Sequence, residues 1–384
     1  MKTKYGILAV TVYTMTIIIC GHFYGMVAYL TPLLDVGKKV SNQLSTVRPH
    51  GTRLPLRNIP ANRQMKVGEQ LRLQVPVSIP DQKPFLLRCY TCSLVSSSGQ
   101  LLNSSAGHKI DQSDCIIRMN DAPTVGFEKD VGSRTTIRVI GHSNLKPILS
   151  NPNNPVVGSS HENSENVVIA WLYKTNIYKD FAYTAVLNFS QVYRNVNFFT
   201  QTPEMMKANN QRFWTETGIT RNQAQTWLTT GWHALLLAID VCSHITVYGM
   251  VDDEYCRDNP NSSVPYHYYN NNNQSGKIKK ECEYYMKSER KLHGGHLFVT
   301  EKFIFGRWAR NYNITFRHPE WSKKNYSRSS IDTPFMKLFR QKHPQNSTSN
   351  ETDNFWENKT SLQDSVNSYK AESNGDFMVV WRGR

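Results

Sequence analysis

Small polar residues at positions 96–99, Ser-Ser-Ser-Gly, follow directly after a short apolar stretch at 93–95. Small residues at the end of a buried strand let backbone N–H groups close around an anion, as in nucleotide-binding α/β proteins. The run therefore predicts a phosphate-binding loop. A hydrolase with Ser97 or Ser98 as nucleophile is an alternative, but the loop lacks the glycine that precedes the serine in a G-x-S-x-G elbow.

Two further clusters contain residue types that bind metals. Asp252, Asp253 and Glu254 form an acidic triplet, and Cys89 and Cys92 have the spacing of half a zinc site. No second closely spaced Cys or His pair completes that site in the sequence, so disulfides are the better interpretation of the cysteines. For the triplet, a solvated loop is the alternative to a metal site.

The elements that must position these residues are indicated by apolar segments that recur through residues 85–321. Buried strands are predicted at 167–171 and 245–250, and helices at 232–242 and 301–310. In the last helix, Ile304, Phe305 and Trp308 share one side. Alternation of strands and helices predicts an α/β fold with a mostly parallel central sheet and helices on both faces.

The ends of the 384-residue chain differ from this central part. An uncharged stretch at 5–34 exceeds the roughly 20 residues that a spanning helix needs. A cleaved signal peptide is the alternative, but no small-x-small cleavage site follows the apolar core. We expect a cytoplasmic tail (1–5), a signal-anchor transmembrane segment (6–34), a luminal stem (35–84), a catalytic domain (85–322) and a mobile Asn/Ser/Thr-rich C-terminal tail (323–384).

Glycosylation signals and cysteines agree with a luminal location. Nine Asn-x-Ser/Thr sequons occur, at Asn103, Asn188, Asn261, Asn273, Asn313, Asn325, Asn346, Asn350 and Asn358. Apart from Cys20 in the apolar run, an even set of cysteines remains: Cys89, Cys92, Cys115, Cys242, Cys256 and Cys282. Six cysteines allow fifteen pairings, among which spacing alone does not choose.

The formal net charge of +15 indicates an anionic partner. Basic, aromatic-rich chains can bind nucleic acid. The predicted anchor and the sequons place this chain away from nucleic acid, so anionic small molecules or glycans are the better expectation.

Four segments together resemble the sialylmotifs of the eukaryotic sialyltransferases, glycosyltransferase family 29. Residues 92–139 resemble the large motif, 229–250 the small motif and 265–269 the third motif, and residues 296–301 have the H-x-x-x-x-E spacing of the very small motif. The segments occur in the family's order, within a resemblance that covers about residues 86–322. The details VPYHYY and GGHLFVTEK are most similar to the alpha-N-acetylgalactosaminide alpha-2,6-sialyltransferases.

This resemblance implies a single Rossmann-like domain of the GT-A-like variant type in a type II membrane protein of the Golgi. It also implies an inverting enzyme that moves sialic acid from CMP-sialic acid to the 6-hydroxyl of GalNAc in sialylated O-glycans or gangliosides. The family works without a metal or other cofactor, which favours the solvated loop for residues 252–254. The alternatives are an inactive, sialoglycan-binding relative and a sialyltransferase of another linkage.

Roles for individual residues follow from the same resemblance. His296 would be the catalytic base, and His267 would hydrogen-bond the departing CMP phosphate. Glu301 and Tyr266 would support them, with His293 the nearest competing histidine. The donor-binding residues would be Ser97, Ser98, Gly99, Asn120, Thr230 and Gly231. The resemblance pairs Cys92 with Cys242; Cys256 with Cys282 is then a local loop closure, and Cys89 with Cys115 remains.

Two positions depart from the family's pattern. Asn270 stands where the third motif usually carries an acidic residue or glutamine. Gly141 and His142 replace a more typical Asn-His or Ser-His end of the large motif. These departures bear on acceptor preference more than on the core reaction.

Overall fold

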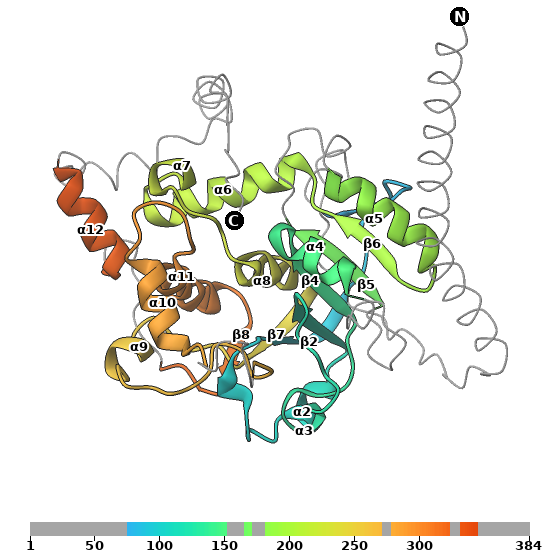
Figure 1. Ribbon diagram of the computed structural model, residues 1–384, viewed down its shortest axis with the longest axis horizontal. Coiled ribbons are helices and arrows are strands. Elements are labelled where there is room, and N and C mark those ends of the chain that lie inside the picture. The colour runs from blue at the N-terminus through green and yellow to red at the C-terminus, as the bar shows by residue number, and fades with distance from the viewer. Residues whose placement is uncertain (1–74, 152–164, 171–180, 271–277, 323–330, 345–384) are drawn as a thin grey trace, which may run out of the picture.

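The computed structural model describes residues 75–151, 165–170, 181–270, 278–322 and 331–344 (Figure 1). The predicted cytoplasmic tail, signal anchor and most of the stem lie outside these residues, as does the chain beyond 344. Among the described residues, no helix combines the length and the apolar character needed to cross a membrane.

An eight-stranded sheet forms the centre of the domain, in the order β1-β6-β5-β4-β3-β2-β7-β8. Its strands are β1 (Val77–Ser78), β2 (Cys89–Val95), β3 (Cys115–Met119), β4 (Ile137–Gly141), β5 (Asn166–Ala170), β6 (Asn197–Thr200), β7 (Cys242–Tyr248) and β8 (Ile314–Arg317). β1 pairs antiparallel with β6, and the other neighbours pair in parallel. The predicted mostly parallel sheet is confirmed.

Helices cover both faces of this sheet, as predicted. The helices of the described residues are α2 (Gly107–Asp111), α3 (Glu128–Val131), α4 (His142–Ser150), α5 (Phe181–Val192), α6 (Pro203–Thr217), α7 (Arg221–Ala224), α8 (Thr230–Val241), α9 (Tyr255–Asp258), α10 (Glu281–Glu289), α11 (Phe298–Asn311) and α12 (Pro334–Lys342). One face packs into a core with α6, α8, α11 and α12, and the other carries α4 and α5 beside a smaller cluster under α2 and α3. In Figure 1, α10, α11 and α12 gather on the side of the molecule opposite α4 and α5.

The chain reverses its direction across the sheet between β2 and β7. From β2 it proceeds outward through β3, β4 and β5 to β6, and it then returns to add β7 and β8 on the other side of β2. In open α/β sheets, such a switch point leaves a crevice outside the carboxyl ends of the two strands. The loop after β2 and the loop after β7 are therefore placed together at this crevice.

The predicted elements are present, with some different ends. The predicted helix 232–242 is α8, which is buried almost all round and packs Trp232 against Trp308 with ring centroids 4.7 Å apart. The predicted strand 245–250 begins earlier, at Cys242, because Cys242 and the exposed His244 pair with β2 without adding to the apolar run.

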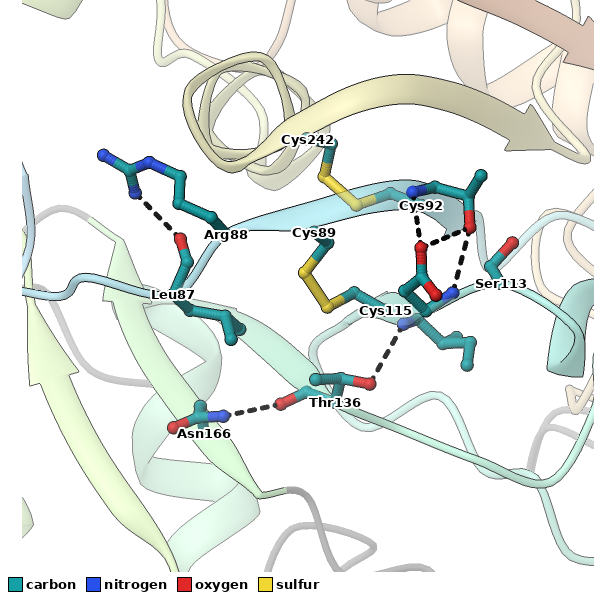
Figure 2. Close-up of a disulfide and its surroundings, with 12 residues drawn as sticks. Leu87, Arg88, Cys89, Cys92, Ser113, Cys115, Thr136, Asn166 and Cys242 are labelled. Carbon is teal, nitrogen blue, oxygen red and sulfur yellow. Dashed lines mark hydrogen bonds between the residues drawn. A yellow bond between two sulfur atoms is a disulfide. The ribbon is translucent and has the colours of Figure 1, made fainter. Parts of the chain in front are cut away.

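Three disulfides have the pairings predicted from the resemblance. Cys89–Cys115 and Cys92–Cys242 tie β2 to its two neighbours, β3 and β7 (Figure 2). Cys256–Cys282 joins α9 to α10. The sulfur atoms of Cys89, Cys92 and Cys115 lie close enough for a shared metal ion, but the disulfide bonds use all three, which excludes the zinc alternative.

Part of the region predicted as a mobile tail packs on the domain. Residues 331–344 contain α12, whose Phe335, Met336 and Phe339 are buried in the main core. The overall Asn/Ser/Thr-rich composition hid this helix, although Thr333 followed by Pro334 has the pattern of a helix start. Thr333 accepts a hydrogen bond from the Met336 N–H in that position. The predicted boundary at 322 thus separates α12 from the domain to which it packs.

Candidate active site

A cavity of about 140 Å³ lies at the carboxyl ends of β2, β3 and β7, at the switch point of the sheet. All the predicted catalytic, donor-binding and supporting residues line it except Gly99: Ser97, Ser98, Asn120, Thr230, Gly231, Tyr266, His267, His296 and Glu301. These residues come from widely separated parts of the chain. The fold therefore brings the four predicted motifs to one place.

The loop after β2 is shaped by its own hydroxyl groups. Ser98 Oγ accepts a hydrogen bond from the Gln100 N–H at 3.1 Å, and Ser96 Oγ donates to the Gly249 carbonyl at 2.8 Å. Gly99 lies outside the cavity lining, and its N–H donates to the Pro265 carbonyl at 3.0 Å. A Cβ atom at Gly99 would lie 2.5 Å from Pro265 Cγ. Gly99 thus allows the third motif to pack closely on this loop, and its N–H is not available to a phosphate.

Asn120 directs its amide group from the end of β3. Its backbone has the left-handed φ of 50°, which Asn tolerates better than most residues. Its carbonyl accepts from the buried Arg138 at 2.8 Å, and its Oδ1 accepts from the Gly141 N–H at 3.0 Å. These contacts occupy acceptors, so the side-chain NH₂ remains the group with which Asn120 can donate into the cavity.

Gly141 explains one departure from the family's pattern. A Cβ atom at this position would lie 2.6 Å from Thr230 Oγ1. The absence of a side chain therefore lets the end of β4 approach the first residue of α8.

Glu301 fixes the start of α8 against α11. Its carboxyl group accepts from the Thr229 N–H at 2.9 Å and shares a hydrogen bond with the Thr229 hydroxyl, while Thr229 Oγ1 accepts from the Trp232 N–H at 3.0 Å. Burial raises the pKa of Glu301 to about 8, and the hydrogen bonds from Thr229 oppose this rise. The first turn of α8, with Thr230 and Gly231, is thereby held at the cavity, where helix N–H groups attract anions.

His296 is held in one tautomer. Its Nδ1 lies 2.6 Å from the Trp227 carbonyl oxygen, which can only accept, so Nδ1 carries the proton and Nε2 keeps a lone pair. Burial lowers the pKa of His296, and the contact with Trp227 partly opposes this. A neutral imidazole with a free Nε2 is suited to accept a proton.

His267 has the opposite arrangement. Its Nδ1 accepts from the Asn270 side-chain NH₂ at 3.2 Å, which leaves the proton on Nε2. Burial lowers the pKa of His267 to about 4, although Asp121 acts in the other direction. The ring stacks on Tyr266 with centroids 4.2 Å apart. His267 is therefore a neutral hydrogen-bond donor, and Asn270, the second departure from the family's pattern, sets its tautomer.

Comparison with known proteins identifies the family. The sequence model of glycosyltransferase family 29 (sialyltransferase) matches residues 38–294. This chain belongs to the sialyltransferase family. It is 39% identical over 251 residues to the human alpha-N-acetyl-neuraminyl-2,3-beta-galactosyl-1,3-N-acetyl-galactosaminide alpha-2,6-sialyltransferase, covering 64% of this chain and 79% of that protein. It is 38% identical to the human alpha-N-acetylgalactosaminide alpha-2,6-sialyltransferase 3, covering 64% of this chain and 78% of the relative.

Among solved structures, a crystal structure of a mammalian sialyltransferase aligns with this chain at 19% identity. The alignment has a TM-score of 0.36 and covers 59% of this chain and 68% of the other.

The family match ends at residue 294, so His296 and α11 follow directly after it.

Two further lining residues of this sialyltransferase, Phe298 and Lys302, lie in the segment GGHLFVTEK but were assigned no role from the resemblance. The ring of Phe298 lies 5.4 Å from that of His296 and 6.2 Å from that of Tyr266, on which His267 stacks, by ring centroids. Lys302 is only 5% exposed, and its Nζ lies 3.9 Å from the centroid of the Tyr285 ring. The sequence feature that could have pointed to Lys302 is its position directly after Glu301, inside the GGHLFVTEK segment.

Other candidates lie away from the cavity of this sialyltransferase. His293 is exposed and bonds to Gln225, and it does not line the cavity.

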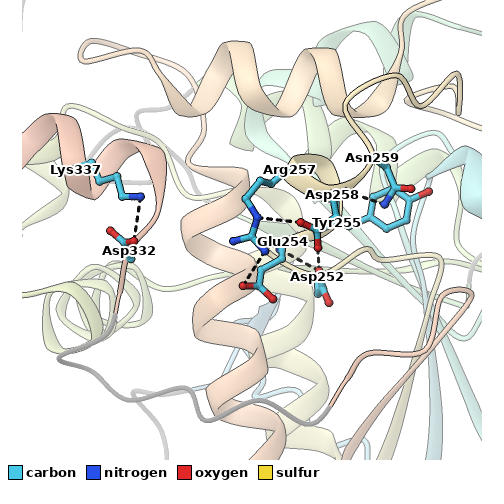
Figure 3. A network of polar contacts seen from close by, with 8 residues as sticks. All are labelled: Asp252, Glu254, Tyr255, Arg257, Asp258, Asn259, Asp332 and Lys337. Carbon is cyan, nitrogen blue, oxygen red and sulfur yellow. Dashed lines mark hydrogen bonds and ion pairs between the residues drawn. The ribbon is translucent and has the colours of Figure 1, made fainter.

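The acidic triplet has a structural role. Asp252 Oδ1 accepts from the Glu254 and Tyr255 N–H groups at the start of α9, and Glu254 pairs with Arg257 at 3.1 Å (Figure 3). These contacts belong to a partly exposed loop and use two of its three carboxylates.

Proposed function

We propose that this sialyltransferase moves sialic acid from CMP-sialic acid to the 6-hydroxyl of GalNAc, with inversion of the anomeric centre. The observation that carries the proposal is the pair of histidines in one cavity with opposite tautomers. His296 presents an acceptor nitrogen and His267 presents a donor N–H, which are the two groups that the reaction requires.

In the proposed step, the acceptor oxygen attacks the anomeric carbon of sialic acid while the bond from that carbon to the phosphate oxygen breaks. His296 Nε2 takes the proton of the hydroxyl group as the new carbon–oxygen bond forms. The electron pair of the broken bond leaves with CMP. The Nε2–H of His267 hydrogen-bonds the departing phosphate, and the N-terminus of α8 adds a favourable dipole for the anionic donor.

We further propose that the reaction needs no metal ion. CMP leaves with a single phosphate, which a neutral donor and a helix N-terminus can stabilise, whereas a diphosphate leaving group would carry more charge. Asp252 and Glu254, the obvious carboxylate ligands, already cap α9 and pair with Arg257.

The acceptor class is proposed from the relatives. Their names specify GalNAc-containing acceptors and, in the first case, an acceptor that already carries sialic acid. A net charge of +15 is compatible with such an anionic acceptor.

The proposed location is the Golgi membrane, with residues 6–34 as the anchor and the catalytic domain in the lumen. Within the described part of the chain, the sequon asparagines are exposed: Asn103, Asn188, Asn261 and Asn313. Exposure is the condition for their glycosylation, so removal of N-glycans from the expressed protein should increase its electrophoretic mobility.

The test uses the full-length, disulfide-intact protein with CMP-sialic acid in EDTA. The acceptors are sialyl-Gal-GalNAc on threonine, its asialo form, a monosialo-ganglioside and lactosamine, with the new linkage read by NMR. We expect alpha-2,6 transfer to GalNAc that His296→Ala abolishes and that the matched control His293→Ala retains. Folded protein that releases no CMP with any acceptor would instead favour a sialoglycan-binding protein.

A further inference from the structure

Helix α12 lies outside the part of the chain that matches the family, yet it contacts the helix that follows His296. The match ends at residue 294, whereas α12 spans Pro334–Lys342. Phe335 and Met336 bury their side chains in the core that α11 shares. The first turn of α12 is thereby held against the start of α11.

A directed chain of hydrogen bonds connects the two helices. Thr300 Oγ1 lies 2.5 Å from Glu289 Oε1, to which it donates, and 2.7 Å from Thr333 Oγ1. A hydroxyl group has one proton, and Thr300 gives its proton to the ionised form of Glu289, whose pKa burial raises to about 7. Thr333 must therefore donate to Thr300.

At its other end, this series of hydrogen bonds holds the backbone around His296. Glu289 accepts from the Val299 N–H at 2.9 Å and from the Thr300 N–H at 3.2 Å, so it caps the N-terminus of α11. The preceding residue, Ser288, accepts from the His296 N–H at 3.0 Å and donates to the His296 carbonyl at 2.8 Å. Two consecutive residues of α10 thus fix the base and the helix behind it.

The side chains that form this series of hydrogen bonds are all buried. Glu289 and Thr300 are 0% exposed, and Thr333 is 3% exposed. A buried carboxylate is tolerated only when donors surround it, and hydrogen bonds in series strengthen one another. The Thr333 hydroxyl polarises Thr300 and so strengthens the cap that Glu289 provides to α11.

We propose that Thr333, the residue that caps α12, is a positioning residue for His296. The inference rests on the proposed role of His296 as the base. Thr333 does not touch the cavity; it acts through Thr300 and Glu289 on the segment that carries the imidazole.

The test compares Thr333→Val with Thr333→Ser in the full-length protein. The valine variant keeps the shape but removes the hydroxyl, and it should lower kcat about tenfold, the factor that corresponds to one net hydrogen bond. The KM for CMP-sialic acid should stay the same, because the predicted donor contacts lie mainly on the loops after β2 and β3 and on α8. The acidic limb of the pH–kcat profile should move upward as His296 becomes more hydrated, and the serine variant should restore both.

Two control variants on α12 distinguish the loss of the Thr333 hydroxyl from a general destabilisation of the helix. Lys337 forms an exposed ion pair with Asp332 at 3.0 Å (Figure 3), so Lys337→Ala should leave kcat unchanged. Phe335→Leu should lower the melting temperature without moving the pH profile. If Thr333→Val does not fold, Thr333→Ala makes the same comparison.

Unchanged kcat and pH profile in Thr333→Val, or equal effects of Thr333→Val and Phe335→Leu on the pH profile, would overturn the inference. A failure of the proposed function looks different. In that case the wild type is inactive or His296→Ala is fully active, whatever happens at Thr333.

Discussion

Asn270 determines what His267 can do, and Asn270→Asp tests this directly. In the wild type, the Asn270 NH₂ donates to His267 Nδ1 at 3.2 Å, so the neutral imidazole always carries its proton on Nε2. An aspartate carboxylate can only accept a hydrogen bond. The substitution therefore moves the proton of the neutral ring to Nδ1 and leaves Nε2 unable to donate to the departing phosphate.

The size of the effect follows from the pKa of His267. Burial lowers this pKa to about 4 in the wild type. A carboxylate in hydrogen-bonding contact raises the pKa of a neighbouring cation by about 1–3 units, to roughly 5–7. In Asn270→Asp, only the protonated imidazole still has an Nε2–H. Activity should therefore be retained below this new pKa and fall by up to about tenfold for each pH unit above it.

The assay is kcat against pH from 5 to 8 for the wild type, Asn270→Asp and Asn270→Gln. The glutamine variant keeps the amide donor and serves as the control. We expect a limb that falls with rising pH in the aspartate variant alone, and ¹⁵N NMR should report the change of tautomer at His267. A pH profile of Asn270→Asp that coincides with the wild type would refute the assignment of the donor role to Nε2–H.

Three further predictions concern stability and ligand binding. Replacing both Cys92 and Cys242 with alanine should lower the free energy of unfolding by about 5 kcal/mol, which is the loop-closure entropy expected for their sequence separation of 150. Unfolding in guanidinium measures this loss. A loss under about 1 kcal/mol would contradict the entropic account. For Glu301, whose pKa is raised from 4.5 to about 8, the folded state retains a proton that the unfolded state releases, so stability falls as pH rises between these values. Glu301→Gln should flatten this slope, which is at most about 1.4 kcal/mol per pH unit, and an unaltered slope would show that other groups cause it. Lys302→Met removes a buried cation from the cavity wall and should weaken CMP binding about tenfold. Calorimetry measures the affinity, with Lys337→Ala as the control. Equal affinities of the wild type and Lys302→Met would exclude a contact of Lys302 with the nucleotide.

The site was more predictable from the sequence than the ends of the elements that form it. Ser97, Asn120, His267 and His296 belong to short motifs whose order is informative, and the parallel sheet brings strand ends together at one edge. The role of Gly99 was not predictable, since its N–H bonds to Pro265, which is distant in the sequence.

Helix starts show why local patterns are incomplete. The predicted helix 301–310 begins at Phe298 in the structure, because the first N–H groups of α11 are capped by Glu289 of another helix rather than by a neighbouring residue. The helix at 334–342 carries its own signal at Thr333 and Pro334, but the composition of the surrounding region obscured it. Caps supplied by tertiary contacts leave no pattern in the adjacent sequence.

The crossing of the two disulfides on β2 has a consequence for how the chain is made. In the sheet register, Cys92 lies opposite Cys115 and Cys89 lies opposite Cys242, yet the bonds join Cys89 to Cys115 and Cys92 to Cys242. During synthesis Cys89, Cys92 and Cys115 emerge long before Cys242, so Cys92 and Cys115 can oxidise together before the native partner exists. Release from that bond requires thiol–disulfide exchange. We therefore expect the yield of native protein to depend on a disulfide isomerase, and the enzyme's abundance in a cell to respond to the redox state of the compartment in which it folds.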